Sequence, residues 1–151
     1  MFRTLIIGAV SALTLSAAAL AQQGGTPQQA RAMLDKAVAA VKADQAVALA
    51  TFLKGEGGFL DRDLYPFCFR NADGKLLVSP KAVQAGTDIR SLKDANGSAY
   101  GEAIYAAGQK PEVTEVGPYL FPKPGTTTPT FPKISFVTKV GELGCGVGYY
   151  K

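Results

Sequence analysis

Two cysteines, Cys68 and Cys145, are the residues with the clearest potential chemistry in this chain. In a protein that is exported to an oxidising compartment, an even pair of cysteines is typical of a disulfide bond. Closing a loop of this length would stabilise the folded state by about 4 kcal/mol, because the cross-link restricts the unfolded chain. The sequence therefore predicts a disulfide, and two buried free thiols are the competing interpretation.

Histidine is absent from all 151 residues, which excludes several kinds of active site. Neither a Ser-His-Asp nor a Cys-His catalytic unit can form, and no histidine can bind zinc or haem. We therefore expect no metal and no cofactor. Enzymatic activity is not expected either, and a small hydrolase-type enzyme that uses a lysine or an aspartate is only a minor alternative.

The first 21 residues have the pattern of a signal peptide for export. Arg3 supplies a positive charge, an apolar run extends from Leu5 to Leu20, and the chain then offers a small-x-small cleavage site that ends at Ala21. The apolar run is shorter than the roughly 20 residues that a membrane-spanning helix needs. We expect a mature protein of residues 22–151 in the periplasm or outside the cell, with no membrane insertion after cleavage; a retained anchor is the alternative.

Length and charge favour one ordinary domain after the signal peptide. The residues that remain are enough for a single hydrophobic core, and no internal repeat or linker divides them. The chain has 16 Lys and Arg against 12 Asp and Glu, and the basic residues are spread along it. Because nucleic-acid-binding proteins usually have a clustered basic face, no nucleic acid is expected as a partner.

Apolar periodicity predicts a helix at the start of this domain. Apolar residues at three- and four-residue spacing run from Pro27 to Leu53, are interrupted at Asp44 and Gln45, and stop before Gly55. This pattern predicts one long helix that is bent near Asp44.

A hairpin and three further strands are expected after the helix. Residues 65–70 and 76–78 flank the turn-forming residues 71–74, which is typical of a hairpin. The remaining expected elements are a connecting segment over 79–96, a short helix within 98–109, strands over 113–121, 133–140 and 143–150, and an exposed Pro/Thr-rich loop over 122–132.

Several motifs, taken in chain order, resemble the single Cache domain family, and most closely its standalone exported members. The resemblance covers nearly all residues after the signal peptide. The motifs that carry it are Asp63-Leu64-Tyr65-Pro66-Phe67, Asp73-Gly74-Lys75, the segment from Gly86 through Leu92-Lys93-Asp94 to Gly97, Lys133-Ile134-Ser135-Phe136-Val137, and Gly144-Cys145-Gly146-Val147-Gly148-Tyr149.

The resemblance implies an α+β fold with a PAS-like five-stranded antiparallel sheet of order 2-1-5-4-3. A long N-terminal helix would pack on one side of this sheet, and a short lid helix is also implied. In that strand order the first and fifth strands are neighbours, which would place Cys68 beside Cys145.

The resemblance also implies a small-molecule site between the sheet and the segment that covers it. Because side chains alternate along a strand, Tyr65 and Phe67 are expected on the face opposite the cysteines, together with Tyr150 and the glycines of the last strand. Either a ligand or the aromatic rings themselves would fill the space that those glycines leave. Further aromatic walls are expected from Tyr100, Tyr119 and Phe121.

Three charged residues are candidates for polar contacts with such a ligand. Lys133 stands at the start of a strand, where the family pattern also has a basic residue, and could hold a carboxylate. Asp88 and Arg90 lie in the expected lid and could hold an amine and an acid. For each of the three, the alternative is a solvated surface charge.

The leading functional hypothesis is an exported module that binds a small organic ligand, such as an amino acid, a carboxylate or an amine. Receptors with Cache domains carry a second membrane helix and a cytoplasmic output, whereas this chain stops at Lys151 after its last strand. Any signal would therefore have to pass through a partner such as a membrane receptor. The alternative is a periplasmic interaction or accessory protein that contacts a partner through loop 122–132 and binds no small ligand.

Overall fold

The structure, a computed structural model, describes residues 24–151, so the expected signal peptide over 1–21 lies outside the described residues. Its five strands form one antiparallel sheet of order β2-β1-β5-β4-β3, which confirms the order implied by the resemblance. The elements are α1 (Pro27–Ala43), α2 (Gln45–Lys54), β1 (Pro66–Arg70), β2 (Leu76–Val78), the 3₁₀ turn η1 (Ile89–Ser91), α3 (Tyr100–Ala107), β3 (Thr114–Pro122), β4 (Thr130–Val140) and β5 (Leu143–Tyr150).

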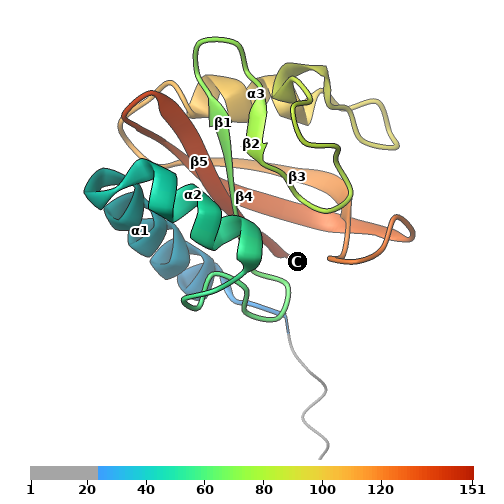
Figure 1. The fold of residues 1–151 in the computed structure, drawn as a ribbon. Coiled ribbons are helices and arrows are strands. Elements are labelled where there is room, and N and C mark those ends of the chain that lie inside the picture. The colour runs from blue at the N-terminus through green and yellow to red at the C-terminus, as the bar shows by residue number, and fades with distance from the viewer. Residues whose placement is uncertain (1–23) are drawn as a thin grey trace, which may run out of the picture.

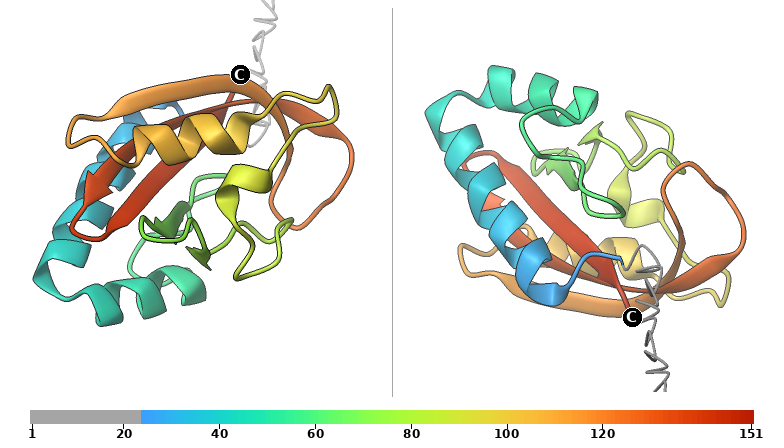
Figure 2. Two further views of the ribbon diagram at one scale, coloured as in Figure 1. Left: turned by 90° about the horizontal axis from the view of Figure 1, so that it is seen from above. Right: turned by 90° about the horizontal axis from the view of Figure 1, so that it is seen from below.

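The sheet separates two layers, each with its own hydrophobic core (Figures 1 and 2). Helices α1 and α2 lie on one face, where Leu34 packs in the same core as Cys68. Helix α3 and η1 cover the other face, where Ile104 packs in the same core as Phe69 and Val137. We call this second face the lid face and call residues 79–107 the lid.

The long helix predicted at the start of the domain is in fact two helices, and Asp44 is the reason. Its backbone is extended, with φ −159° and ψ 104°, so the helical path stops there. The N–H of Asp44 caps the carboxyl end of α1 by donating to the Ala40 carbonyl, and its carboxylate accepts from the N–H of Val47 to start α2. A short polar side chain that can cap a new helix competes with continuing the old one.

The other predicted elements lie close to where the sequence placed them. The hairpin, the short helix and the last three strands are all present, and β3 has a register irregularity between Val116 and Tyr119, around Gly117 and Pro118. The loop over 122–132 is shorter than predicted, because β4 already begins at Thr130. Within residues 24–151, no helix has the length and apolar character needed to cross a bilayer.

The predicted disulfide joins two neighbouring strands. Cys68 on β1 and Cys145 on β5 are direct partners in the antiparallel register, with their Cα atoms 4.2 Å apart. Both side chains are fully buried under α1 and α2. The disulfide prediction is therefore confirmed, and the alternative of two free thiols is excluded.

Candidate functional site

The lid face of β5 has no side chains along most of its length, and neighbouring aromatic rings occupy that space. A Cβ added to Gly144 would lie 2.3 Å from the ring of Phe69, and one added to Gly146 would lie 2.5 Å from the ring of Phe67. Both rings are buried. At these two positions the rings themselves fill the space opposite the glycines.

At Gly148, the third glycine on this face of β5, the side chain of Lys133 fills the space. This side chain is 2 % exposed, and a Cβ on Gly148 would lie 2.4 Å from Cε of Lys133. The ammonium donates a hydrogen bond of 2.9 Å to the hydroxyl of Tyr65. It also lies 4.6, 4.7 and 5.2 Å from the ring centres of Tyr65, Phe121 and Tyr150, within the range of cation–π attraction.

The ammonium of Lys133 has no acidic partner of its own in the part of the chain that the structure describes. Among residues 24–151, no carboxylate lies within ion-pair distance of it. Burial lowers the pKa of Lys133 to about 7; the charge of Asp63 opposes this effect and that of Lys123 adds to it. Asp63 is itself paired with Lys123 at 3.0 Å. A buried cation without a counter-ion favours the approach of an anion.

Several buried or half-buried tyrosines around Lys133 stay uncharged. Burial holds the pKa values of Tyr65, Tyr119 and Tyr150 well above the ordinary value, and it raises the pKa of Tyr100 to about 12. The hydroxyl of Tyr119 shares a hydrogen bond of 2.7 Å with Ser135, and its ring stacks on Tyr100 with centres 4.3 Å apart. Tyr65 accepts from Lys133, so its own hydroxyl hydrogen can be donated to a ligand.

A small cavity lies between this cluster and the lid. Its volume is about 20 Å³, which leaves room for about one water molecule. None of its lining residues is acidic. The lining consists of Phe67, Leu76, Pro80, Val83, Ile89, Leu92, Tyr100, Ile104, Tyr119, Phe121 and Lys133. An organic ligand therefore fits only if the lid or the rings move outward.

Seven of the nine side chains expected at a ligand site lie in or around this cavity. Phe67, Tyr100, Tyr119, Phe121 and Lys133 line it. Tyr65 and Tyr150 do not line it, but their rings are among those around the ammonium of Lys133.

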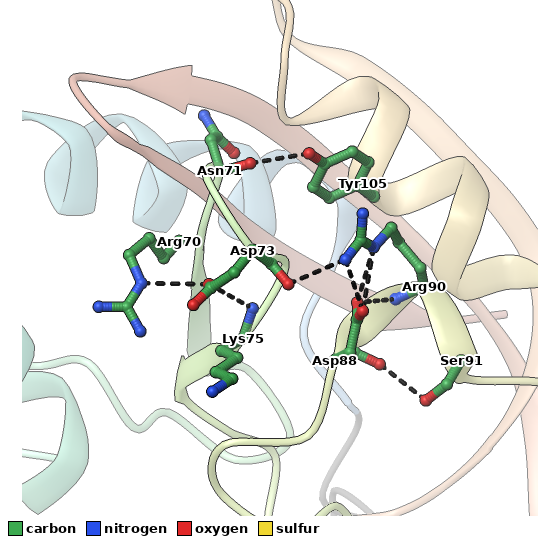
Figure 3. A network of polar contacts seen from close by, with 8 residues as sticks. All are labelled: Arg70, Asn71, Asp73, Lys75, Asp88, Arg90, Ser91 and Tyr105. Carbon is green, nitrogen blue, oxygen red and sulfur yellow. Dashed lines mark hydrogen bonds and ion pairs between the residues drawn. The ribbon is translucent and has the colours of Figure 1, made fainter.

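The other two expected residues, Asp88 and Arg90, lie outside the lining and bind to each other (Figure 3). Their charged groups are 2.6 Å apart, and Arg90 also donates to the carbonyl of Asp73 and lies over the ring of Tyr105. The hydrogen bond from Arg90 lowers the pKa of the Asp88 carboxyl. In this network the pair fastens the start of η1 to the β1–β2 turn.

Sequence reasoning missed Ser135 and most of the lid side of the cavity. Ser135 is fully buried and lies two residues after Lys133 on β4, so strand alternation could have placed it on the same face. The apolar lid residues Val83, Ile89 and Leu92 come from a segment without periodicity, which gave no signal. Within the described range, no group of acidic residues or cysteines could hold a metal ion.

Replacing Gly148 with alanine should displace Lys133 and destabilise the protein. The new methyl group would lie 2.4 Å from Cε of Lys133 and 2.6 Å from Oγ of Ser135. Overpacking of this kind costs about 1–3 kcal/mol, which urea unfolding would measure. The control is the same substitution in a Lys133→Ala background, where the cost should be smaller because one clash is gone. An equal cost in both backgrounds would contradict the placement of Lys133.

The comparisons with known proteins agree with this architecture. A family model described as Single Cache domain 2 matches residues 7–150. The chain belongs to the single Cache domain family. Among curated proteins, no sequence matches this single Cache domain.

Three solved structures share the fold of this single Cache domain. A methyl-accepting chemotaxis protein from Vibrio parahaemolyticus is 19% identical, with 82% of this chain and 86% of that chain covered and a TM-score of 0.63. A periplasmic sensor domain of a chemotaxis protein is 23% identical, with coverage of 82% and 88% and a TM-score of 0.60. A Cache chemosensory domain, described for its carboxylic acid recognition, is 22% identical, with coverage of 82% and 86% and a TM-score of 0.59.

Proposed function

We propose that this single Cache domain binds a small organic carboxylate under its lid, with Lys133 as the group that receives the carboxylate. The observation that carries the proposal is the ammonium of Lys133, which is buried at the wall of an apolar cavity and has no carboxylate partner in the described part of the chain. Carboxylic acid recognition by a Cache chemosensory domain of similar fold supports the same ligand class.

The neighbouring groups suit a carboxylate. The ammonium of Lys133 can donate to one carboxylate oxygen, and the free hydroxyl hydrogen of Tyr65 can be donated to the other. The rest of the lining is mainly apolar and would receive a short hydrocarbon part. Because the closed cavity has room for about one water, the smallest acids are the first candidates.

We infer that binding, without turnover, is the activity of this domain, and that it acts as an exported sensor module in the periplasm. Its output would pass through a partner such as a membrane receptor. The likeness of its fold to periplasmic chemotaxis sensor domains supports this role.

Thermal shift and calorimetric titration with acetate, propionate and lactate would test the proposal. A ligand at 100 times its Kd should stabilise the protein by about 2.7 kcal/mol. Lys133→Met keeps the length of the side chain and should weaken binding by about 10- to 100-fold, because a charge-assisted hydrogen bond is lost. Lys139→Met, an exposed lysine on the same strand, is the control and should bind as the wild type does.

Two outcomes would refute this function. Either no small carboxylate stabilises the purified protein, or Lys133→Met binds one as well as Lys139→Met does. For a carboxylate that binds, the affinity should also fall as the pH is raised from 7 to 9, because neutral Lys133 no longer offers a charge.

A further inference from the structure

A second, larger hollow lies beside the carboxyl end of α2 and shares only Pro80 of its lining with the lid cavity. Its volume is about 320 Å³, within the range of roughly 300–1,000 Å³ that is typical of small-molecule sites. Residues from α2, the segment before β1, the end of β2 and the β3–β4 loop form it. They are Phe52, Leu53, Lys54, Gly55, Phe59, Leu60, Arg62, Tyr65, Pro66, Val78, Ser79, Pro80, Lys81, Pro124 and Gly125. We call it the α2 groove.

The α2 groove has an apolar base that continues to its rim. Phe52 and Phe59 pack edge to face with ring centres 4.5 Å apart, and both are buried. Leu53 and Leu60 belong to the same lining but are 63% and 52% exposed. Exposed apolar surface that surrounds a hollow is typical of a binding site. A ligand with a hydrocarbon or aromatic body would cover these side chains.

The charges of the α2 groove all have the same sign. Its lining includes Lys54, Arg62 and Lys81 and no acidic residue. Arg62 is held in place by Asp61 and Gln29. Lys54 and Lys81 form no ion pair with any residue in 24–151, and both are exposed at the rim. An anionic head group can therefore approach these ammonium groups without displacing a protein carboxylate.

We propose that the α2 groove is a second ligand site, which takes an organic anion with an apolar body, such as a medium-chain or aryl carboxylate or sulfonate. The apolar body lies over Phe52, Phe59 and Leu60, and the head group faces Lys54 and Lys81. This class differs from the short acids proposed for the lid cavity, because the groove is much larger. Pro80 lines both hollows, and the hydroxyl of Tyr65, a residue of the groove lining, accepts a hydrogen bond from Lys133.

Fluorescence titration with 1-anilinonaphthalene-8-sulfonate, followed by displacement with octanoate, tests this site in the folded protein. The double variant Lys54→Gln/Lys81→Gln should bind about three- to tenfold more weakly, as expected for partly exposed charge pairs. Leu60→Asp places a negative charge on the apolar side of the groove and should weaken binding at least as much. The matched control is Lys110→Gln/Lys139→Gln, two exposed lysines elsewhere, which should bind as the wild type does.

Amide chemical shifts locate the bound probe, and circular dichroism checks that each variant is folded. The proposal predicts shifts in residues 52–66, 78–81 and 124–125, and unchanged affinity in Lys133→Met. Shifts confined to residues 82–107 of the lid, an affinity that neither groove variant alters, or no binding at all would overturn it. The two sites are separable, since Lys133→Met tests only the short acids and the lysine pair tests only the α2 groove.

Discussion

Wild-type protein should be about 3 kcal/mol more stable to urea at pH 9 than at pH 6, and Lys133→Met should remove most of this difference. The unfolded chain holds the Lys133 proton up to an ordinary pKa of 10.5, whereas burial makes the folded protein release it near pH 7. Between these two values the unfolded state binds more protons, so the free energy of unfolding rises with pH. The free energy of unfolding rises by up to about 1.4 kcal/mol per pH unit.

Because of its composition, the chain has few other side chains that titrate in this pH range. There is no histidine, and both cysteines are in the disulfide, so neither of the side-chain types that ordinarily titrate closest to neutral pH contributes. The terminal amino group, which titrates at about 8, is present in both proteins. Measurements should stop near pH 9, because the raised pKa values of Tyr65, Tyr119 and Tyr150 lower the stability once unfolded tyrosine ionises.

Urea unfolding followed by circular dichroism at several pH values between 6 and 9 would give the free energies. Lys133→Met should be more stable than the wild type at pH 6, since it buries no charge, and the gap should narrow toward pH 9. If the free energy of unfolding changed with pH in the same way in both proteins, burial of the Lys133 ammonium would be contradicted.

Removing the disulfide should lower the free energy of unfolding by about 4 kcal/mol. The bond joins residues that are 77 positions apart, so it restricts a large part of the unfolded chain. A loss of this size is a substantial share of the 5–15 kcal/mol that typically stabilise a domain. Cys68→Ala/Cys145→Ala is the cleaner variant, because serine would bury two hydroxyl groups at fully enclosed positions.

The comparison is between oxidised protein, protein that was reduced during unfolding, and the double alanine variant, each unfolded in urea. The reduced protein and the variant should share a similar, lower midpoint, and a reductant should leave the variant unchanged. A decrease of less than about 1 kcal/mol in the free energy of unfolding would mean that the disulfide adds little to the stability that the packing of β1 against β5 already provides.

Much of the architecture could be predicted from the sequence, because local patterns and tertiary structure agree. Alternation in residues 65–70 and the turn after them predicted the β1–β2 hairpin, and the resemblance supplied the strand order. The break at Asp44 was interpreted as a bend, since apolar spacing resumes after it. Only the backbone shows that the same aspartate ends one helix and begins the next.

The candidate site could be predicted only in part. Lys133 and the aromatic residues lie on strands, directly before β1 or on α3, where periodicity tells which face a side chain occupies. Asp88 and Arg90 lie in a segment without periodicity, so the sequence could not show that they pair with each other at the β1–β2 turn. Burial of Lys133 depends on Gly148, on rings from β3 and β5, and on the ring of Tyr65 just before β1, and no single-strand pattern contains that information.

The covalent bond and the cavity lie on opposite faces of the same two strands. Cys68 and Cys145 tie β1 to β5 on the helix side, while Phe67 and the glycines of β5 form the floor on the other side. This floor cannot widen by separation of its strands. The lid is held by hydrogen bonds, an ion pair and packing, so entry of a ligand depends on movement of the lid or of the aromatic rings and not on separation of β1 from β5.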